Sequence, residues 1–216
     1  RGPVGNHRGL MPTLNLQVGA SGDDAYQDSG GTADTTYSAP NIGTGAAASS
    51  PDRAFGLRFT GVTIPPGATI DSASLTMLKS GAQWSNVEFT WRGHDADNAG
   101  AFTGGEDLTA RALTTASVSV SENSNHADAT WYSLPAGADL KAIVQEIVDR
   151  AGWSSGNAIV ILGIGDSTNS FASNTYHMYD SAAANAAKLD ITYTVTVGPA
   201  ITVDYSNHPK LSRMGR

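Results

Sequence analysis

The sequence predicts an all-β protein, folded as a jelly-roll β-sandwich with one short amphipathic helix and with extended arms at its N- and C-termini. Three observations lead to this fold class. Apolar and polar residues alternate in many short segments, which is the period of a half-buried strand. Glycine, at 24 of 216 residues, separates these segments, and charged residues make up only 15% of the chain. One segment alone has helical spacing, and many strands with a single helix are typical of a sandwich.

About ten segments have the alternation or the composition of strands. In the first of them, Leu14, Leu16 and Val18 share one face of the predicted strand. The run 159–164 is apolar throughout, which predicts a strand buried on both faces. Shorter candidates lie near 25–26 and 36–37. The clearest predicted strands span 13–18, 55–60, 68–79, 87–92, 118–120, 130–134, 159–164, 176–179, 189–195 and 201–203.

The predicted helix lies between two of these strands. Apolar residues recur at helical spacing from Leu140 to Val148, which gives one apolar stripe of about three turns. Asp139 suits the first turn, and Arg150 suits the last turn, because each complements the helix dipole. Gly152 predicts the end of the helix.

Composition excludes several classes of protein. The chain has no cysteine, which excludes disulfides, thiolate metal sites and a cysteine nucleophile. Its formal net charge is −7, unlike that of a basic nucleic-acid binder. No apolar run approaches the roughly 20 residues that span a bilayer. We therefore expect neither a nucleic-acid partner nor a membrane partner.

Charge divides the chain into an N-terminal arm at 1–12, a sandwich domain at 13–196, and a C-terminal strand and basic arm at 197–216. The two ends hold five of the 13 basic residues and one of the 20 acidic ones, so the domain between them is acidic. Basic ends on an acidic body predict contacts with neighbouring molecules, although short basic ends also serve solubility alone. The strand-like sequence at 201–205 suits addition to a neighbouring sheet. The predicted assembly contacts are Arg1, Arg8, Lys210, Arg213 and Arg216.

Three stretches of the domain follow a known pattern. Residues 58–70 read RFTGVTIPPGATI, and SASL follows at 72–75. Residues 144–158 contain a helical VQEIV and then the group WSSGNA, and 179–193 end in KLDITY. These stretches resemble the DNRLRE-type β-sandwich domains. The chain departs from that pattern in two respects: Ala187 stands where the family usually has proline, and the name-giving DNRLRE string is absent.

The resemblance covers about 13–196 and leaves both ends outside. It implies a jelly roll similar to carbohydrate-binding modules, of the kind found in bacterial surface proteins and phage virion proteins. Its motifs are mostly structural, so they support the fold more than the function. Pro65, Pro66 and Gly67, for example, predict a tight turn before a core-facing strand, and Trp153 is expected in the core.

Acidic loops offer one candidate metal site. Asp95, Asp97 and Asn98 lie close enough in sequence for their side chains to converge in a turn, and calcium prefers such oxygen ligands. The resemblance also implies a structural calcium, as sandwiches of this kind often have one. The same residues explain a turn without any ion, since Asp and Asn side chains hydrogen-bond to nearby backbone. The complete calcium-loop pattern and its distal glutamate are absent.

Aromatic residues in loops offer a candidate ligand site. Trp84, Trp131 and Tyr132 lie in or beside segments of loop composition, where an exposed ring face would stack on a sugar. Trp84 suits a contact between subunits or a partly buried position equally well. Trp91 alternates with Phe89 and is expected in the core.

No catalytic constellation stands out. The 20 acidic residues include no pair marked for glycoside hydrolysis, and the sequence lacks the Gly-x-Ser-x-Gly elbow of serine hydrolases. His94, His126 and His177 have no partner motif nearby, and the Gly163–Gly165 stretch lacks the third glycine of a nucleotide-binding loop. We therefore predict a protein without enzymatic activity.

These features predict a structural protein of a virion or of another extracellular surface assembly, such as a phage capsid-decoration, head-fibre or tail component. In this interpretation the sandwich is displayed as a homo-oligomer, and the basic ends dock onto neighbouring copies or onto capsid or tail proteins. The alternative is a carbohydrate-binding module that binds surface glycans.

Overall fold

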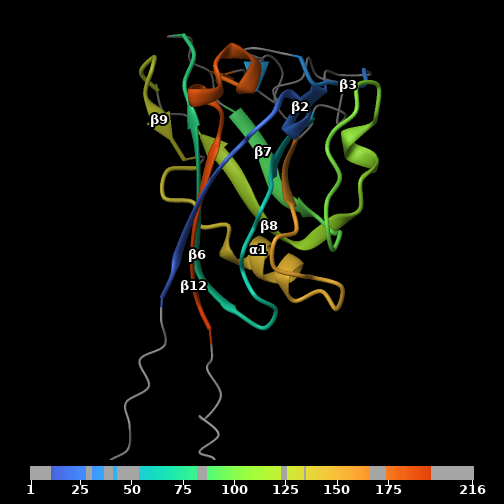
Figure 1. Cartoon of the computed structure of the whole chain (residues 1–216). Coiled ribbons are helices and arrows are strands. Elements are labelled where there is room, and N and C mark those ends of the chain that lie inside the picture. The colour runs from blue at the N-terminus through green and yellow to red at the C-terminus, as the bar shows by residue number, and fades with distance from the viewer. Residues whose placement is uncertain are drawn as a thin grey trace, which may run out of the picture.

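A computed structural model shows a β-sandwich made of two antiparallel sheets and one helix (Figure 1). The all-β class and the sandwich are therefore confirmed. The predicted N-terminal arm, apart from residues 11 and 12, and residues 197–216 lie outside the described residues, as does the strand expected at 201–203. The structure describes residues 11–27, 31–36, 41–42, 54–81, 87–122, 126–133, 135–165 and 174–195.

The first sheet contains four strands and joins the two ends of the domain. Its central strands are antiparallel, with Leu189 opposite Leu75, and the register shifts between Thr192 and Tyr193. In order across the sheet, the strands are β1 (Thr13–Gln17), β12 (Lys188–Thr194), β6 (Thr69–Leu78) and β9 (Trp131–Tyr132).

The second sheet contains six strands. A separate two-stranded sheet, β11 (Asn174–Thr175) with β4 (Asn41–Ile42), lies near the end of β6, where the Ser80 amide donates to the Thr175 carbonyl. The described residues also form four short 3₁₀ helices: η1 (Ser21–Asp23), η2 (Leu108–Ala110), η3 (Tyr179–Ser181) and η4 (Ala183–Asn185). In order, the six strands are β3 (Ala33–Asp34), β2 (Asp24–Gln27), β5 (Ala54–Phe59), β10 (Ile159–Gly165), β7 (Val87–His94) and β8 (Leu113–Glu122).

The main core lies between the two sheets. Three aromatic rings from β5 and β7, those of Phe55, Phe89 and Trp91, meet edge to face with centroid distances of 4.9 to 5.3 Å. Such T-shaped pairs add to the stabilisation from buried area. The prediction that Trp91 belongs to the core is confirmed.

A second, smaller core covers the outer face of the six-stranded sheet. Outward side chains such as Val160 and Leu162 meet Phe102 and Leu108, which come from the segment between β7 and β8. Gly56 on β5 leaves space for the Phe102 ring, because a Cβ at this position would overlap that ring. The strand β10 is thus buried on both faces, as its uninterrupted apolar sequence predicts.

The predicted helix is α1 (Lys141–Val148), which is shorter than the expected three turns. Its apolar stripe is buried against the sandwich. Asp139 accepts hydrogen bonds from the amides of Lys141 and of Ala73, so it joins the start of the helix to β6. Within the described residues no helix has the length and apolar character needed to cross a membrane.

Trp153 lies in the core as expected, and its indole N–H donates to the Ile64 carbonyl over 3.0 Å. Two predicted strands differ in length from the observed ones. The strand predicted at 118–120 is part of the longer β8, and the strand predicted at 130–134 is reduced to the two residues of β9. The strand expected at 176–179 is only a bridge at Tyr176 followed by η3, because the chain turns there to reach β12.

Candidate functional site

The two ends of the described body leave it side by side. β1 and β12 are antiparallel neighbours, and the Tyr193 amide donates to the Pro12 carbonyl over 3.2 Å. Figure 1 shows both strands reaching the same end of the sandwich. Residues 1–10 and 196–216 therefore connect to adjacent points, and we call this place, where β1 begins and β12 ends, the exit pole.

Side chains hold the end of β12 at the exit pole in place. Thr194 donates its hydroxyl to Asp71 on β6 over 2.7 Å, and the hydroxyls of Thr192 and Ser72 are 2.6 Å apart. The exit pole is therefore a fixed point of attachment. The predicted assembly contacts, Arg1, Arg8, Lys210, Arg213 and Arg216, all lie outside the described residues.

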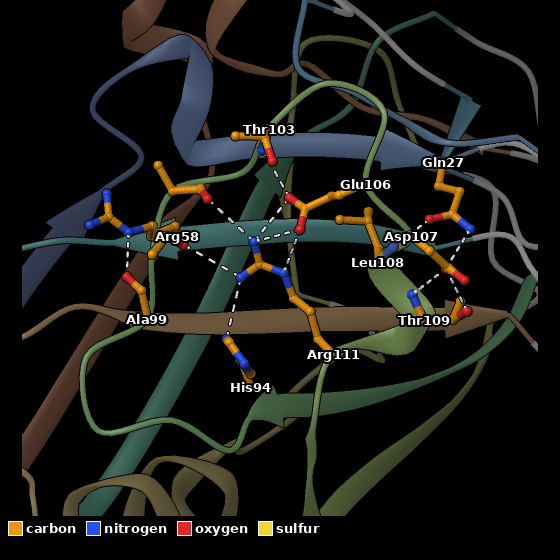
Figure 2. Close-up of polar contacts among 12 residues, drawn as sticks. Gln27, Arg58, His94, Ala99, Thr103, Glu106, Asp107, Leu108, Thr109 and Arg111 are labelled. Atoms are coloured by element: carbon orange, nitrogen blue, oxygen red, sulfur yellow. Dashed lines mark hydrogen bonds and ion pairs between the residues drawn. The ribbon is translucent and has the colours of Figure 1, made fainter.

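A densely hydrogen-bonded segment, residues 95–112, covers the outer face of the six-stranded sheet (Figure 2). Arg111 is at its centre. The guanidinium binds both carboxylate oxygens of Glu106 at 2.9 to 3.2 Å, donates to the carbonyls of Gly100 and Ala101, and lies 4.5 Å from the centre of the Phe102 ring. Bidentate pairing of this kind fixes the direction of both side chains, so Arg111 holds the segment in a closed loop.

The same segment is tied to β2 at its other end. Gln27 accepts from the Leu108 amide over 2.6 Å and donates to Asp107 over 3.0 Å. Asp107 also accepts from the backbone and hydroxyl of Thr109. The hydrogen bond from Gln27, followed by those from Thr109, lowers the pKa of Asp107. These bonds begin η2 and place Leu108 over the sheet.

His94 lies between this network and the loop predicted to bind calcium. Burial, and then the nearby Arg111 guanidinium, lower the pKa of His94, which favours the neutral imidazole. Its Nδ1 is 3.3 Å from an Arg111 nitrogen and suits the role of acceptor. His94 thus serves to hold the loop, and Arg58 does the same from β5 through the Ala99 carbonyl.

Of the three residues predicted to bind calcium, Asp95 and Asp97 meet at the guanidinium of Arg150, whereas Asn98 bonds elsewhere. Arg150, after α1, donates to Asp97 over 2.7 Å and also binds Asp95. Asn98 uses its side-chain oxygen to accept from the Ala158 amide over 2.8 Å, so it joins the loop to the start of β10 rather than forming a local turn. Within the described residues, no group of three or more His, Asp or Glu side chains is arranged to hold a metal ion.

Of the three aromatic residues predicted to bind a ligand, the structure describes Trp131 and Tyr132. Trp84 lies outside the described residues. Trp131 and Tyr132 form β9, and each has a ring face occupied by a neighbour. The Lys188 ammonium lies 4.0 Å from the centre of the Trp131 ring, and His126 stacks on Tyr132 with ring centres 3.9 Å apart. One face of each ring is therefore already in contact with a side chain of the same chain, Lys188 for Trp131 and His126 for Tyr132.

Beside β9 lies a buried polar cluster that no sequence motif indicates. Lys79 is fully buried and donates to the carbonyls of Ser80 and Gly81 at 3.0 and 2.8 Å. Burial lowers the pKa of Lys79, and the charge of Asp128 partly offsets this effect. The Tyr176 hydroxyl lies 2.9 Å from His126. The cluster joins the ends of β6, β9 and β11.

Asp24, at the start of β2, is the second buried charge that sequence reasoning does not identify. Its Oδ2 accepts from the Tyr179 amide over 2.8 Å, and its buried Oδ1 has no hydrogen-bond partner in the described structure. Burial raises the pKa of Asp24 to about 7; the hydrogen bond from Tyr179 opposes this rise, and the charges of Asp180 and Asp23 add to it. In the sequence Asp24 resembles any loop aspartate, and only the fold reveals its burial.

No protein-family model matches the chain, and a search of curated proteins found no matching relative.

Proposed function

We propose that this chain is a non-enzymatic structural protein of a virion or of another extracellular surface assembly, and that it docks through its two ends. The observation that carries the proposal is the exit pole, because both basic ends are joined to an acidic body at this one place. Two attachments that begin at one point act together, since binding of the first raises the effective concentration of the second.

The internal contacts of the body support a displayed, inert role. The charged side chains of residues 95–112 bind partners within the body: Arg111 pairs with Glu106 of the same segment, and Asp97 pairs with Arg150, which follows α1. We also propose that the sandwich is a jelly roll of the DNRLRE type. The pairing of β1 with β12, the first and last strands among the described residues, supports this finer assignment.

The partners that we propose are neighbouring copies and capsid or tail proteins of the same assembly. An acidic body attracts basic ends, and this attraction between exposed charges weakens as salt screens it. We therefore expect the full chain to form oligomers at low salt that dissociate at high salt, as measured by light scattering.

The test replaces the five basic residues of the two ends with glutamine. This variant should lose the salt-dependent oligomers, whereas the control Lys141→Gln, on an exposed position of the body, should keep them. Monomers of the unaltered chain at every salt concentration, or equal loss in both variants, would contradict docking through the ends.

Carbohydrate binding is the alternative function, and a glycan array separates it from the first. A glycan signal that disappears in Trp84→Ala or Trp131→Ala and persists in the five-residue variant would favour a binding module. We expect no such signal, because the Lys188 ammonium covers one face of the Trp131 ring, where a sugar would stack.

A further inference from the structure

β8 forms one edge of the six-stranded sheet. It has ten residues, Leu113–Glu122, and in the described structure its strand partner is β7 alone. The outer side of an edge strand presents backbone N–H and C=O groups that can pair with another chain. Natural sheets usually protect such edges with charged residues, proline, bulges or a covering loop.

The first part of the β8 edge is protected in this way. Glu146, from α1, accepts from the amides of Thr115 and Ala116, both over 2.7 Å. Arg92, from β7, donates to the carbonyl of Thr114 over 2.7 Å. These two charged side chains occupy backbone groups at positions 114–116 and so hinder the pairing of a further strand there.

The rest of the edge, Ser117–Ser121, has no such protection. The segment contains neither a charged residue nor proline. Among the described residues, its backbone has no hydrogen bond to any element other than β7. The serines are exposed, while Val118 and Val120 face the sandwich. We call this segment the open edge.

Two other edges of the sandwich differ from the open edge. β3 is covered, because the Ala33 amide donates to Glu106 and the Gly105 amide donates back to Ala33. β9 has only two residues. The fourth edge, β1, begins at the exit pole and therefore belongs to the region already proposed for docking.

The open edge reads Ser-Val-Ser-Val-Ser, which is the same in both directions. We propose that it pairs with the open edge of a second copy, antiparallel and about a two-fold axis at Ser119. In this register Ser119 lies opposite Ser119 of the second copy, Ser117 opposite Ser121, and Val118 opposite Val120. Every pair joins residues of the same type, and opposed serines can hydrogen-bond across the two strands.

The charged neighbours also limit the register. Glu122 would lie opposite Ala116 of the second copy, where Glu146 already accepts the amide. A shift toward the start of β8 meets the same protected positions. The paired region is therefore five residues on each chain, which is shorter than a stable interface usually requires, so the body alone should associate weakly and reinforce an assembly rather than create one.

Cysteine substitution tests this register, because the chain has no cysteine of its own. Directly opposed residues in antiparallel strands have Cα atoms about 4.5 to 5.5 Å apart, within the range for a disulfide. Ser119→Cys should therefore cross-link two copies under mild oxidation. Ser121→Cys is the matched control, because two such residues would lie about 14 Å apart along the strands.

A double variant provides the converse test. Ser117→Cys with Ser121→Cys places a cysteine opposite a cysteine at both ends of the pairing, so it should cross-link although Ser121→Cys alone does not. Dimers are measured on non-reducing gels and by mass spectrometry. Equal cross-linking in Ser119→Cys and Ser121→Cys, or none in Ser119→Cys at the highest attainable concentration, would overturn the proposal.

Weak association of the unaltered chain is measured by sedimentation equilibrium. Ser119→Lys would place two like charges on the two-fold axis and should abolish this association. Ser74→Lys, on the exposed face of the central strand β6, should leave it unchanged. The variant with neutral ends should still cross-link through Ser119→Cys, so failure of the open edge and failure of docking through the ends give different results.

Discussion

Replacement of Asp24 by asparagine is the most informative test of the energetics of this fold. The carboxyl group is buried, one of its oxygens has no hydrogen-bond partner among the described residues, and burial raises its pKa from the ordinary 3.8 to about 7. Between these two values the folded protein holds a proton on Asp24, whereas the unfolded chain has released it. Folding therefore takes up a proton in this range of pH.

The sign and size of the effect follow from this uptake. Because the folded state binds the extra proton, the contribution of Asp24 to the free energy of unfolding is greatest below about pH 4 and falls as pH rises, until it levels off above about pH 7. A difference of about three pKa units corresponds to an effect on the order of 4 kcal/mol, which is an upper value. Asparagine has nearly the same shape and cannot ionise, and its side-chain oxygen can still accept from Tyr179.

Urea denaturation of both proteins across this range of pH provides the measurement. Asp24→Asn should match the unaltered chain within about 1 kcal/mol near pH 4 and exceed it by up to about 4 kcal/mol near pH 8, with the same dependence on urea. Asp180→Asn is the control, because it removes only one of the charges that raise the pKa of Asp24 and should give a smaller change. A difference that does not vary with pH, or that favours the unaltered chain at high pH, would refute the reasoning.

Three further changes test the packing and the loop network. Gly56→Ala places a Cβ against the aromatic ring above it and should destabilise the fold by about 1 to 3 kcal/mol in urea denaturation, whereas Gly100→Ala, which meets open space, should not. Trp153→Phe removes the donor to the buried Ile64 carbonyl and should cost about 1 to 3 kcal/mol in the same assay. Arg150→Gln removes the guanidinium between the two predicted calcium ligands, so added calcium should raise the Tm of this variant more than that of the unaltered chain.

The main strands and the helix could be predicted because their signals are local. The alternation at 68–79 corresponds to β6, and the apolar stripe that ends at Val148 corresponds to α1. Residues 95–112, which cover the outer face of the six-stranded sheet, have no comparable local periodicity. Phe102 and Leu108 are isolated apolar residues among glycine, threonine and charged residues, and only their meeting with β10 shows that they form a second core.

The candidate sites were harder to predict, because the role of a charged side chain depends on its partner. Asp95 and Asp97 are two positions apart in the sequence, as in a calcium loop, but their partner Arg150 is more than fifty residues away. Lys79 ends a predicted strand and would ordinarily be exposed, yet the fold buries it completely. Neither contact has a signature in the local sequence.

The sequence by itself determined the all-β class, the two-sided burial of β10 and the separation of basic ends from an acidic body, since periodicity and charge are properties of neighbouring residues. Only the tertiary structure decided that β1 pairs with β12, so that the chain enters and leaves the described body at one pole, and that Asp24 is buried with one oxygen unpartnered among the described residues. Distant segments create these features by meeting, and the strength of an electrostatic or hydrogen-bonding interaction depends on what surrounds a group after folding.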